Sequence, residues 1–286
     1  MQYLIGVDGG GSGCRVILTS IQGKTLAKAE GGPANIETSF KTARENIIDA
    51  CKKAFKNAKI SENNFNNSFA ILGLAGSNLG NYAAQLSDKL PFARNKILND
   101  GEITLEGAIG PVDGCIGALG TGSVFVGRKN GITKLTGGWG FSLGDDGSGA
   151  KLGKELMRLS IRCHDGLNEH TDLTIEFLKK FKNNIKSIVE ITKSFKPKDY
   201  ADFAPEIFTA MDNHDSNAKK IIESEVILIE QSLMASGFSE QNAFCLIGGL
   251  GKLFLPFLSD KFINTCKPPK GNALQGAIAI AKREFF

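Results

Sequence analysis

A glycine-rich turn directly after the first apolar stretch constrains the fold of this chain more than any other feature. Residues 3–7 form an apolar run, residues 8–13 form the turn, and a second apolar run covers residues 14–20. Both runs have the composition of β-strands, so they predict a hairpin. Glycine lacks a Cβ, and such a turn can therefore point backbone N–H groups at a bound anion. The residues expected to bind phosphate here are Gly10, Gly11, Ser12 and Gly13.

The acid that opens this turn is a candidate metal ligand. Asp8 stands next to the expected phosphate site, where a carboxylate can hold a divalent cation through water. The turn is not a P-loop, because no Lys-Ser or Lys-Thr follows the glycines. It also differs from a dinucleotide-binding turn, since residues 14–20 are predicted to form a strand rather than a helix. An ordinary glycine-rich hairpin remains the alternative for this turn taken alone.

Two further glycine-rich turns follow apolar runs later in the chain. Residues 115–119 lead into a Gly-Thr-Gly-Ser turn, and residues 123–127 leave it. Residues 245–247 meet a Gly-Gly pair, which lets the backbone approach a flat group such as adenine. The residues expected to contact a nucleotide are Gly120, Thr121, Gly122, Ser123, Gly248 and Gly249. Three such turns, two with the same strand–turn–strand form, favour a shared ligand over three unrelated structural turns.

An acid between the first two turns is the candidate general base. Asp100 ends an apolar run at residues 97–98. Phosphoryl transfer needs little covalent help from the protein, but the attacking hydroxyl must lose its proton to a positioned acceptor. Asp100 also precedes a predicted helical turn at residues 102–108, so it is a candidate helix N-cap as well. The two roles are compatible.

The order of these motifs resembles that of the superfamily of sugar kinases, heat-shock chaperones and actin. Residues 271–277 resemble its second connecting motif, a helix whose small residues let two domains pack and hinge. Residues 137–149, Gly-Gly-Trp-Gly-Phe-Ser-Leu-Gly-Asp-Asp-Gly-Ser-Gly, are more specific. They resemble the N-acetylglucosamine kinase and bacterial glucosamine kinase group of the BadF/BadG/BcrA/BcrD-type ATPase family. The resemblance implies an α/β fold with two actin-like, ribonuclease H-like domains around an ATP cleft.

The same resemblance, together with the apolar periodicity, predicts the domain organisation. The N-terminal domain is expected to comprise residues 1–106 and 272–286, and the second domain residues 107–271. The second domain carries a helical insertion, because residues 172–237 show few strand signals. Other predicted elements are a helix at 39–58, a strand at 68–74, a helix after Ser148, a strand at 243–247 and a helix at 271–282. The last helix crosses back to the first domain, which is therefore discontinuous.

Residues 137–149 also contain most of the candidate sugar contacts. Asp145 and Asp146 can accept hydrogen bonds from sugar hydroxyls, and charge-assisted bonds of this kind are the stronger ones. Trp139, the only tryptophan, can lie beside a sugar or seal its pocket, and ordinary core packing is the alternative. Gly140 keeps the backbone close to a ligand. In the family the acid that matches Asp145 contacts the sugar, whereas the position of Asp146 is more often acidic than not.

Several of these residues have a plain structural alternative. The adjacent acids would also suit a solvated turn before a helix capped by Ser148. Asn35, in a Pro-Ala-Asn segment, resembles a loop that contacts sugar hydroxyls in this group, but it also suits a local turn. Thr121 contacts the substrate or only orders its own turn. The expected substrate-binding residues are Asn35, Asp100, Thr121, Trp139, Gly140, Asp145 and Asp146.

Together with these motifs, the family resemblance implies an enzyme that uses ATP and Mg²⁺ to phosphorylate an amino sugar at its 6-hydroxyl. N-acetylglucosamine is favoured, because Trp139-Gly140 resembles the N-acetylglucosamine kinases; glucosamine, N-acetylmannosamine and N-acetylmuramate are the alternatives. More distant alternatives are a non-catalytic sugar sensor and the activator ATPase of a 2-hydroxyacyl-CoA dehydratase-like system. Such activators carry a cysteine-containing sequence where this chain has residues 145–149, although Cys115 and Cys163 keep that alternative open.

Composition narrows the possible partners. The formal net charge is only +4, and Lys and Arg are spread along the chain, which argues against a nucleic-acid or membrane-surface partner. No apolar run approaches the roughly 20 residues of a membrane span, and Asp8 interrupts the short apolar N-terminus, so no signal peptide is expected. The six cysteines show neither zinc spacing nor a disulfide framework. We expect a cytoplasmic enzyme, and the family resemblance implies a homodimer.

Overall fold

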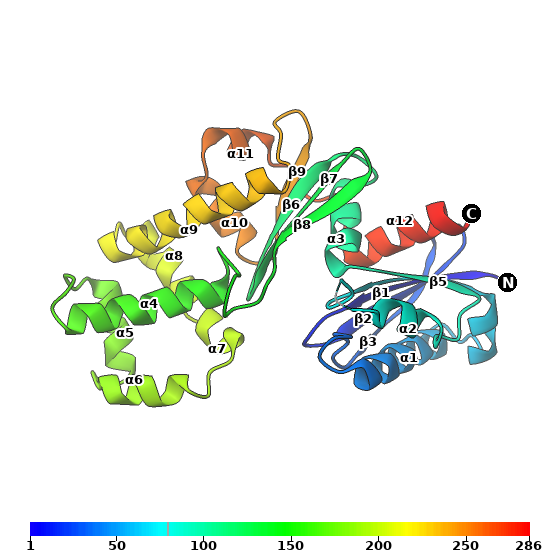
Figure 1. Cartoon of the computed structure of the whole chain (residues 1–286), viewed down its shortest axis with the longest axis horizontal. Coiled ribbons are helices and arrows are strands. Elements are labelled where there is room, and N and C mark those ends of the chain that lie inside the picture. The colour runs from blue at the N-terminus through cyan, green and yellow to red at the C-terminus, as the bar shows by residue number, and fades with distance from the viewer. Residues whose placement is uncertain (79) are drawn as a thin grey trace. The chain divides into compact units, whose positions relative to one another are not determined.

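The computed structural model describes residues 1–78 and 80–286 (Figure 1). The chain divides into two compact units, Met1–Val112 with Pro268–Phe286, and Asp113–Lys267. The boundaries thus lie a few residues from the expected ones at 106 and 272. The reason is that helix α3 (Asp100–Ile109) continues beyond residue 106, and the returning chain already bonds to it at Lys270, whose N–H donates to Ala108 O at 2.9 Å.

Unit 1 is built on a mixed five-stranded sheet with the order β3-β2-β1-β4-β5. Its strands are β1 (Tyr3–Gly9), β2 (Cys14–Ser20), β3 (Thr25–Gly31), β4 (Ser68–Leu74) and β5 (Arg94–Leu98). The first three are antiparallel neighbours, whereas β4 and β5 run parallel to β1. The mixed sheet with its leading β1–β2 hairpin agrees with the expected α/β fold class.

Helices cover both faces of this sheet, and β1 shows the resulting two-residue period. Ile5 and Val7 belong to the apolar cluster under α1 (Phe40–Asn57), whereas Leu4 belongs to the cluster under α12 (Ala273–Phe285). A strand buried on both faces is apolar along its whole length, which explains the continuous apolar run at the start of the sequence. The remaining helical elements of this unit are a 3₁₀ helix at Glu62–Asn67 and α2 (Tyr82–Ser87).

Unit 2 repeats the same strand plan with one strand fewer, in the order β8-β7-β6-β9. Its strands are β6 (Gly114–Leu119), β7 (Ser123–Lys129), β8 (Ile132–Gly137) and β9 (Ala243–Ile247). Strand β6 is antiparallel to β7 and parallel to β9, as β1 is to β2 and β4. Each unit therefore opens with a strand–turn–strand hairpin, as the sequence predicts, and the expected fold class is confirmed.

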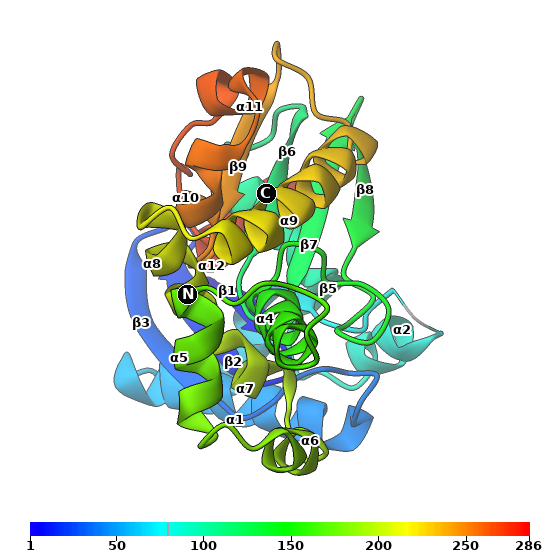
Figure 2. The same cartoon turned by 90° about the vertical axis from the view of Figure 1, so that its left-hand side faces the viewer.

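Between β8 and β9 the chain is helical. The helices are α4 (Gly149–His164), α5 (Asp172–Lys180), α6 (Ile185–Thr192), α7 (Pro197–Ala201), α8 (Ala204–Asp212) and α9 (Ser216–Ala235). After β9 come α10 (Gly251–Phe254), a 3₁₀ helix at Leu255–Phe257 and α11 (Asp260–Thr265). Helix α9 crosses one face of the sheet (Figure 2). Within the described residues no helix is both long enough and apolar enough to cross a bilayer.

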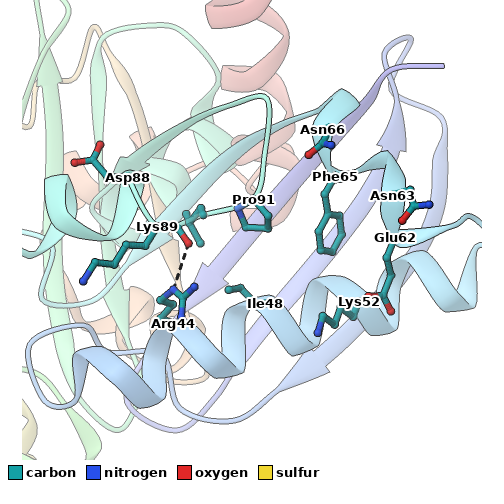
Figure 3. A pocket seen from close by; sticks show the side chains of 11 residues that line it. Arg44, Ile48, Lys52, Glu62, Asn63, Phe65, Asn66, Asp88, Lys89 and Pro91 are labelled. Atoms are coloured by element: carbon teal, nitrogen blue, oxygen red, sulfur yellow. Dashed lines mark hydrogen bonds between the residues drawn. The ribbon is translucent and has the colours of Figure 1, made fainter.

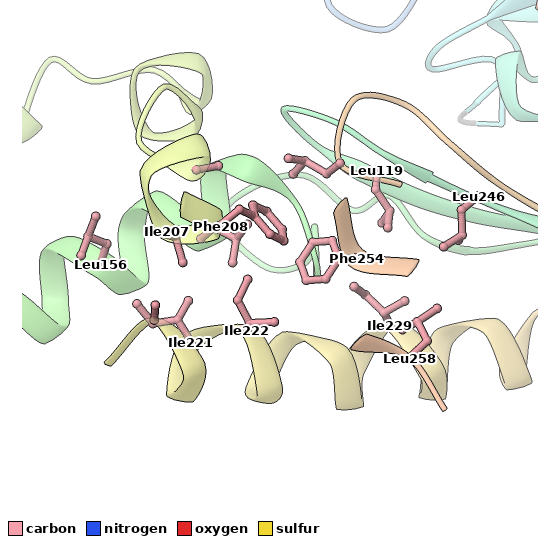
Figure 4. Close-up of a cluster of buried hydrophobic side chains, with 14 of the residues drawn as sticks. Leu119, Leu156, Ile207, Phe208, Ile221, Ile222, Ile229, Leu246, Phe254 and Leu258 are labelled. Atoms are coloured by element: carbon pink, nitrogen blue, oxygen red, sulfur yellow. The ribbon is translucent and has the colours of Figure 1, made fainter. Parts of the chain in front are cut away.

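The core of unit 2 lies between α9 and the elements that face it. Ile222 and Ile229 of α9 point toward Phe208 and Phe254 (Figure 4), and both isoleucines are fully buried. The two phenylalanine rings meet edge to face with their centroids 5.1 Å apart, a favourable aromatic geometry. The helical insertion is thus packed onto the sheet by apolar contacts and forms one core with it.

Close contact between α3 and α12 holds the C-terminal helix in unit 1 (Figure 1). A Cβ on Gly276 would lie 2.0 Å from Ile103 O, and one on Gly107 would lie 2.1 Å from Asn272 O. Both helices therefore need glycine where they touch. This explains the small residues of the 271–277 segment by backbone packing.

We predict that Gly276→Ala destabilises the protein by about 1–3 kcal/mol, because the new methyl group has no space. Helix propensity alone would give the opposite sign, since alanine is favoured over glycine by about 1 kcal/mol. Ala279→Gly, on the exposed side of the same helix, is the control and should lose about 1 kcal/mol through propensity only. Urea unfolding measures both. A stabilised Gly276→Ala variant would contradict the close contact.

Candidate functional site

The first phosphate-type turn is the tip of the β1–β2 hairpin and faces open space. Gly10 N–H donates to Gly13 O at 2.9 Å, which closes the turn. A Cβ placed on Gly10 or Gly11 would meet nothing within 4 Å, and Gly11 and Ser12 are exposed. The turn therefore has room for a ligand along its surface, as a phosphate-binding turn requires.

Asp8 pairs across the hairpin with Arg15, a residue that the sequence analysis did not single out. The two residues are directly opposite in the β1–β2 register, and their side chains form an ion pair. The Asp8 side chain is only 16% exposed, whereas that of Arg15 is 62% exposed. A guanidinium beside an open phosphate-type turn is well suited to a phosphate group. Counting the register outward from the Gly10–Gly13 turn would have identified this pair.

The donor set at Asp8 fits a magnesium ion that keeps most of its own ligands. Within the described part of the chain no cluster of three or more His, Cys, Asp or Glu side chains could form an all-protein metal site. Mg²⁺ commonly uses one or two carboxylates and takes its other ligands from water and substrate phosphates. Asp8, next to the turn, meets that requirement.

Several loops of unit 1 meet at the same edge of its sheet, beyond the carboxyl ends of the parallel strands. Ala75 N–H, after β4, donates to Gly9 O at 2.9 Å, and Ala34 N–H donates to Gly10 O at 2.9 Å. In open α/β sheets this edge is the usual place for a ligand. Asn35 therefore lies near the turn, but its Oδ1 accepts the N–H groups of Glu37 and Thr38 at 3.0 and 3.1 Å. Asn35 therefore does have the expected role in a local turn. Its amide nitrogen takes no part in these two bonds.

Asp100 is the first residue of α3, and the expectation that it caps this helix is wrong. The cap is Asn99, whose Oδ1 accepts Gly101 N–H at 2.8 Å, while Glu102 Oε1 accepts Asn99 N–H at 3.0 Å. This reciprocal capping box satisfies the helix end. The Asp100 carboxylate accepts Gly101 N–H at 2.9 Å and is not used as the cap of the helix.

Burial raises the pKa of the Asp100 carboxyl group. The negative charge of Asp8 raises that pKa further, and the Gly101 N–H bond opposes both effects. Asp8 is the penultimate residue of β1 and Asp100 lies two residues after β5, and these strands are parallel members of one sheet, so both acids lie at the same edge. A carboxylate with a raised pKa takes up a proton more readily, as a general base must.

In unit 2 the second phosphate-type turn is bonded to the start of α4. Gly120 N–H donates to Gly122 O at 2.9 Å, while Gly149 N–H donates to Gly120 O at 2.8 Å and Ala150 N–H to Thr121 O at 3.1 Å. Ser148 caps the helix by accepting Lys151 N–H at 3.1 Å, so the predicted cap is confirmed. The first N–H groups of α4 thus hold the turn in place. Thr121, within the turn, is exposed.

Asp145 joins this turn to the loop of residues 137–147, which we call loop 137–147. Its side chain is buried, and the nearby backbone N–H groups of Ser123 and Gly140 favour the charged form of its carboxyl group. A Cβ on Gly122 would come within 3.0 Å of Asp145 Oδ2, so the glycine admits the carboxylate. Burial raises the pKa of Asp145, and the negative charge of Asp146 raises it further, whereas the two N–H groups lower it.

The two neighbouring acids have different surroundings. Asp146 lies 3.7 Å from Lys151 Nζ, its side chain is 38% exposed, and its backbone O accepts Ser123 Oγ–H at 2.7 Å. Asp145 has φ +62°, an uncommon conformation for a residue with a side chain. Asp145 is therefore the acid that the fold holds in place, whereas Asp146 belongs to the rim of the loop.

Trp139 is 76% exposed, so the core-packing alternative is wrong for this residue. It stands between Gly138 and Gly140, which have φ values of +71° and +83°. These conformations favour glycine and turn the chain sharply on both sides of the indole. A large exposed aromatic side chain on such a loop is suited to cover an apolar ligand face.

The third glycine-rich turn packs on the end of β6, next to the second phosphate-type turn. Gly248 has φ +84°, and a Cβ there would lie 2.2 Å from Leu119 O. Leu250 N–H donates to the same Leu119 O at 3.1 Å, while a Cβ on Gly249 would meet nothing. Because Gly120 follows Leu119 directly, unit 2 brings the expected adenosine turn and the second phosphate turn together.

Two sizeable surface hollows of the described chain are lined by none of the candidate site residues. One, of about 560 Å³, lies between α1 and residues 88–91, where Arg44 Nε donates to Lys89 O at 3.2 Å (Figure 3). The other, of about 770 Å³, lies among α5, α8 and the start of α9. Within each unit the candidate residues lie instead on turns and loops at the ends of strands.

The cysteines do not resemble ligands of a shared cluster. Cys115 and Cys163 are buried, and none of the six cysteines in the described chain forms a disulfide. Burial raises the pKa of the Cys115 thiol to about 12, which disfavours the thiolate that binds metal. These thiols behave as small apolar side chains.

The family model described as the BadF/BadG/BcrA/BcrD ATPase family matches residues 5–268. The chain is 30% identical to the glucosamine kinase GspK of Vibrio cholerae over 282 residues, which covers 98% of this chain and 96% of that protein. It is 27% identical to an N-acetylmuramic acid/N-acetylglucosamine kinase of Clostridium acetobutylicum, with 99% of each chain covered. A crystal structure from Chromobacterium violaceum, of a protein assigned as an N-acetylglucosamine kinase, matches with a TM-score of 0.87 at 30% identity, covering 98% of this chain and 99% of that one.

We predict that Asp100→Asn makes the folded protein more stable at neutral pH. The folded-state pKa of Asp100 is raised above the ordinary value of 3.8, so its contribution to stability is fully present below that value and is lost as pH rises through the folded pKa. Asparagine has no such loss. Unfolding by urea at neutral pH should show the gain, and the gain should vanish below pH 3.8. Asp88→Asn, an exposed site in the same unit, is the control and should change stability little.

Proposed function

The chain belongs to the BadF/BadG/BcrA/BcrD ATPase family, and from this premise we propose that it is an ATP-dependent amino sugar kinase. The observation that carries the proposal is Asp100. This carboxylate is released from capping by Asn99, has a raised pKa, and lies at the sheet edge where the Asp8 turn opens. That combination is what a general base for a hydroxyl nucleophile needs.

In the proposed reaction, unit 1 activates the sugar and binds phosphate. The N–H groups of Gly11, Ser12 and Gly13 and the guanidinium of Arg15 bind phosphate oxygens, since the Gly10 N–H is used within the turn, and Asp8 would hold Mg²⁺. The cation, when bound, neutralises charge on the phosphates. Asp100 accepts the proton of the 6-hydroxyl as its oxygen attacks the γ-phosphorus, and ADP leaves with the bridging oxygen. Because phosphoryl transfer depends chiefly on position and charge, these are the main tasks of the protein.

Unit 2 supplies the remaining contacts. The Gly120–Ser123 turn binds phosphate, and Gly248 and Gly249 lie against adenosine. Asp145 accepts hydroxyl hydrogens from the sugar, and the exposed indole of Trp139 covers the sugar's apolar face, with Gly140 beside it. Asn35 of unit 1 offers its amide nitrogen to a sugar oxygen. Thr121 and Asp146, both at the surface of their turns, contact the substrates from the rim.

We propose N-acetylglucosamine as the sugar. Support comes from loop 137–147, whose Trp139-Gly140 pair resembles that of N-acetylglucosamine kinases, and from the match to the Chromobacterium violaceum structure. Glucosamine is the second candidate, because a protein named glucosamine kinase is 30% identical over nearly the whole chain. An acetamide needs a small apolar pocket and a hydrogen-bond donor, whereas a free ammonium group needs a nearby carboxylate.

We predict that ADP release by the purified protein with Mg-ATP depends on an amino sugar. A coupled assay with N-acetylglucosamine, glucosamine, N-acetylmannosamine, N-acetylmuramate and glucose distinguishes the candidates. Highest kcat/KM with N-acetylglucosamine would support the proposed substrate, and highest kcat/KM with glucosamine would support the second. Slow ADP release that no sugar stimulates would contradict the kinase assignment.

We predict that Asp100→Asn lowers kcat by about 10²- to 10⁴-fold, because the hydroxyl loses its proton acceptor. Nucleotide affinity should stay nearly unchanged, which a titration with a fluorescent ATP analogue measures. In the unmodified enzyme, kcat should fall on the acid side at a higher pH than an ordinary aspartate would impose, since the pKa of Asp100 is raised. Near-normal turnover of Asp100→Asn would show that another group is the base.

A further inference from the structure

Glu225 is a buried acid that none of the motifs above includes. It lies in the middle of α9 and is 2% exposed. Its Oε2 accepts the backbone N–H of Gly147 at 2.7 Å, a contact between residues 78 positions apart. Helix α9 therefore contacts Gly147, the last residue of loop 137–147, through a charge-assisted hydrogen bond, which is one of the stronger kinds.

Gly147, which donates to Glu225, lies at a position that only glycine can occupy without strain or a steric clash. Gly147 has φ +75°, and a Cβ there would lie 2.5 Å from Cγ1 of Ile229, on the same helix as Glu225. Two residues earlier Asp145 also has a positive φ, and Ser148 N–H donates to Asp145 O at 3.0 Å. A non-glycine residue with positive φ persists only where its surroundings hold it in place.

A buried carboxylate at a core position is unfavourable, because its charged form loses the solvation that it has in water. Burial raises the pKa of Glu225, whereas the Gly147 N–H bond and the nearby charge of Lys151 lower it. An apolar side chain of similar volume is often as stable or more stable at such a site. The acid does what an apolar side chain cannot do, because it satisfies a buried N–H and fixes the path of the backbone beside Asp145.

We propose that Glu225 is a positioning residue that fixes loop 137–147 and so holds Asp145 and Trp139 in the conformation that accepts the sugar. Glu225 acts through the Gly147 N–H and has no contact with the reacting atoms. This inference rests on the proposed function for its effect on catalysis, but the effect on the loop itself does not depend on the identity of the substrate.

Two variants of similar size separate the hydrogen bond from the packing. Glu225→Gln keeps an acceptor for Gly147 N–H, whereas Glu225→Met fills the space without one. Glu223→Met, at a 61% exposed acid on the same helix, is the matched control. We expect Glu225→Met to raise KM for the sugar about tenfold or more, with KM for ATP nearly unchanged. Glu225→Gln should stay within about threefold, and Glu223→Met should match the unmodified protein.

A second readout does not require turnover. Trp139 is the only tryptophan, so its fluorescence reports on loop 137–147 alone. Glu225→Met should change the acrylamide quenching of Trp139, and Glu225→Gln should not. Equal quenching in all variants, or equal rises in KM for sugar and ATP, would overturn the positioning role. If no sugar stimulates ADP release, the proposed function fails, and the quenching comparison still decides for or against Glu225.

Discussion

The buried side chain of Asp145 is the group on which the arrangement of the glycine-rich loops in unit 2 depends. It lies against Gly122 of the phosphate-type turn, and the N–H groups of Ser123 and Gly140 favour its charged form, so it links that turn to loop 137–147. The first N–H groups of α4 bind the same turn from the other side through Gly120 O and Thr121 O. A displacement of any one of these segments therefore changes the contacts of the others, so the loops of unit 2 form one connected network.

The two units use the same strand plan for different tasks. In unit 1 the hairpin tip is open, its acid pairs with Arg15, and Asp100 lies at the same sheet edge with a raised pKa. In unit 2 the tip is held against a helix, and Asp145 lies beneath it. In the proposed reaction the repeated hairpin offers a phosphate contact in each unit, and the segments that follow the hairpins offer the base and the sugar contacts.

Three acids in or beside the candidate site are unfavourable for the stability of the folded protein. Burial of Asp100, Asp145 and Glu225 disfavours their charged forms, and Asp145 also has a positive φ. Such conflicts between local preference and fold are typical of functional sites, where selection keeps groups that a purely structural core would replace. The structural glycines at the α3–α12 contact, by contrast, serve packing alone.

The sequence by itself determined the hairpins, the strands at 68–74 and 243–247, the cap at Ser148 and the returning C-terminal helix, because apolar periodicity, glycines and caps act over short distances. Only the tertiary structure decided that Asn99 and not Asp100 caps α3, that Trp139 is exposed, that Arg15 faces Asp8, and that Glu225 holds Gly147. Register, burial and contacts between distant residues arise when elements pack, and no local pattern contains them.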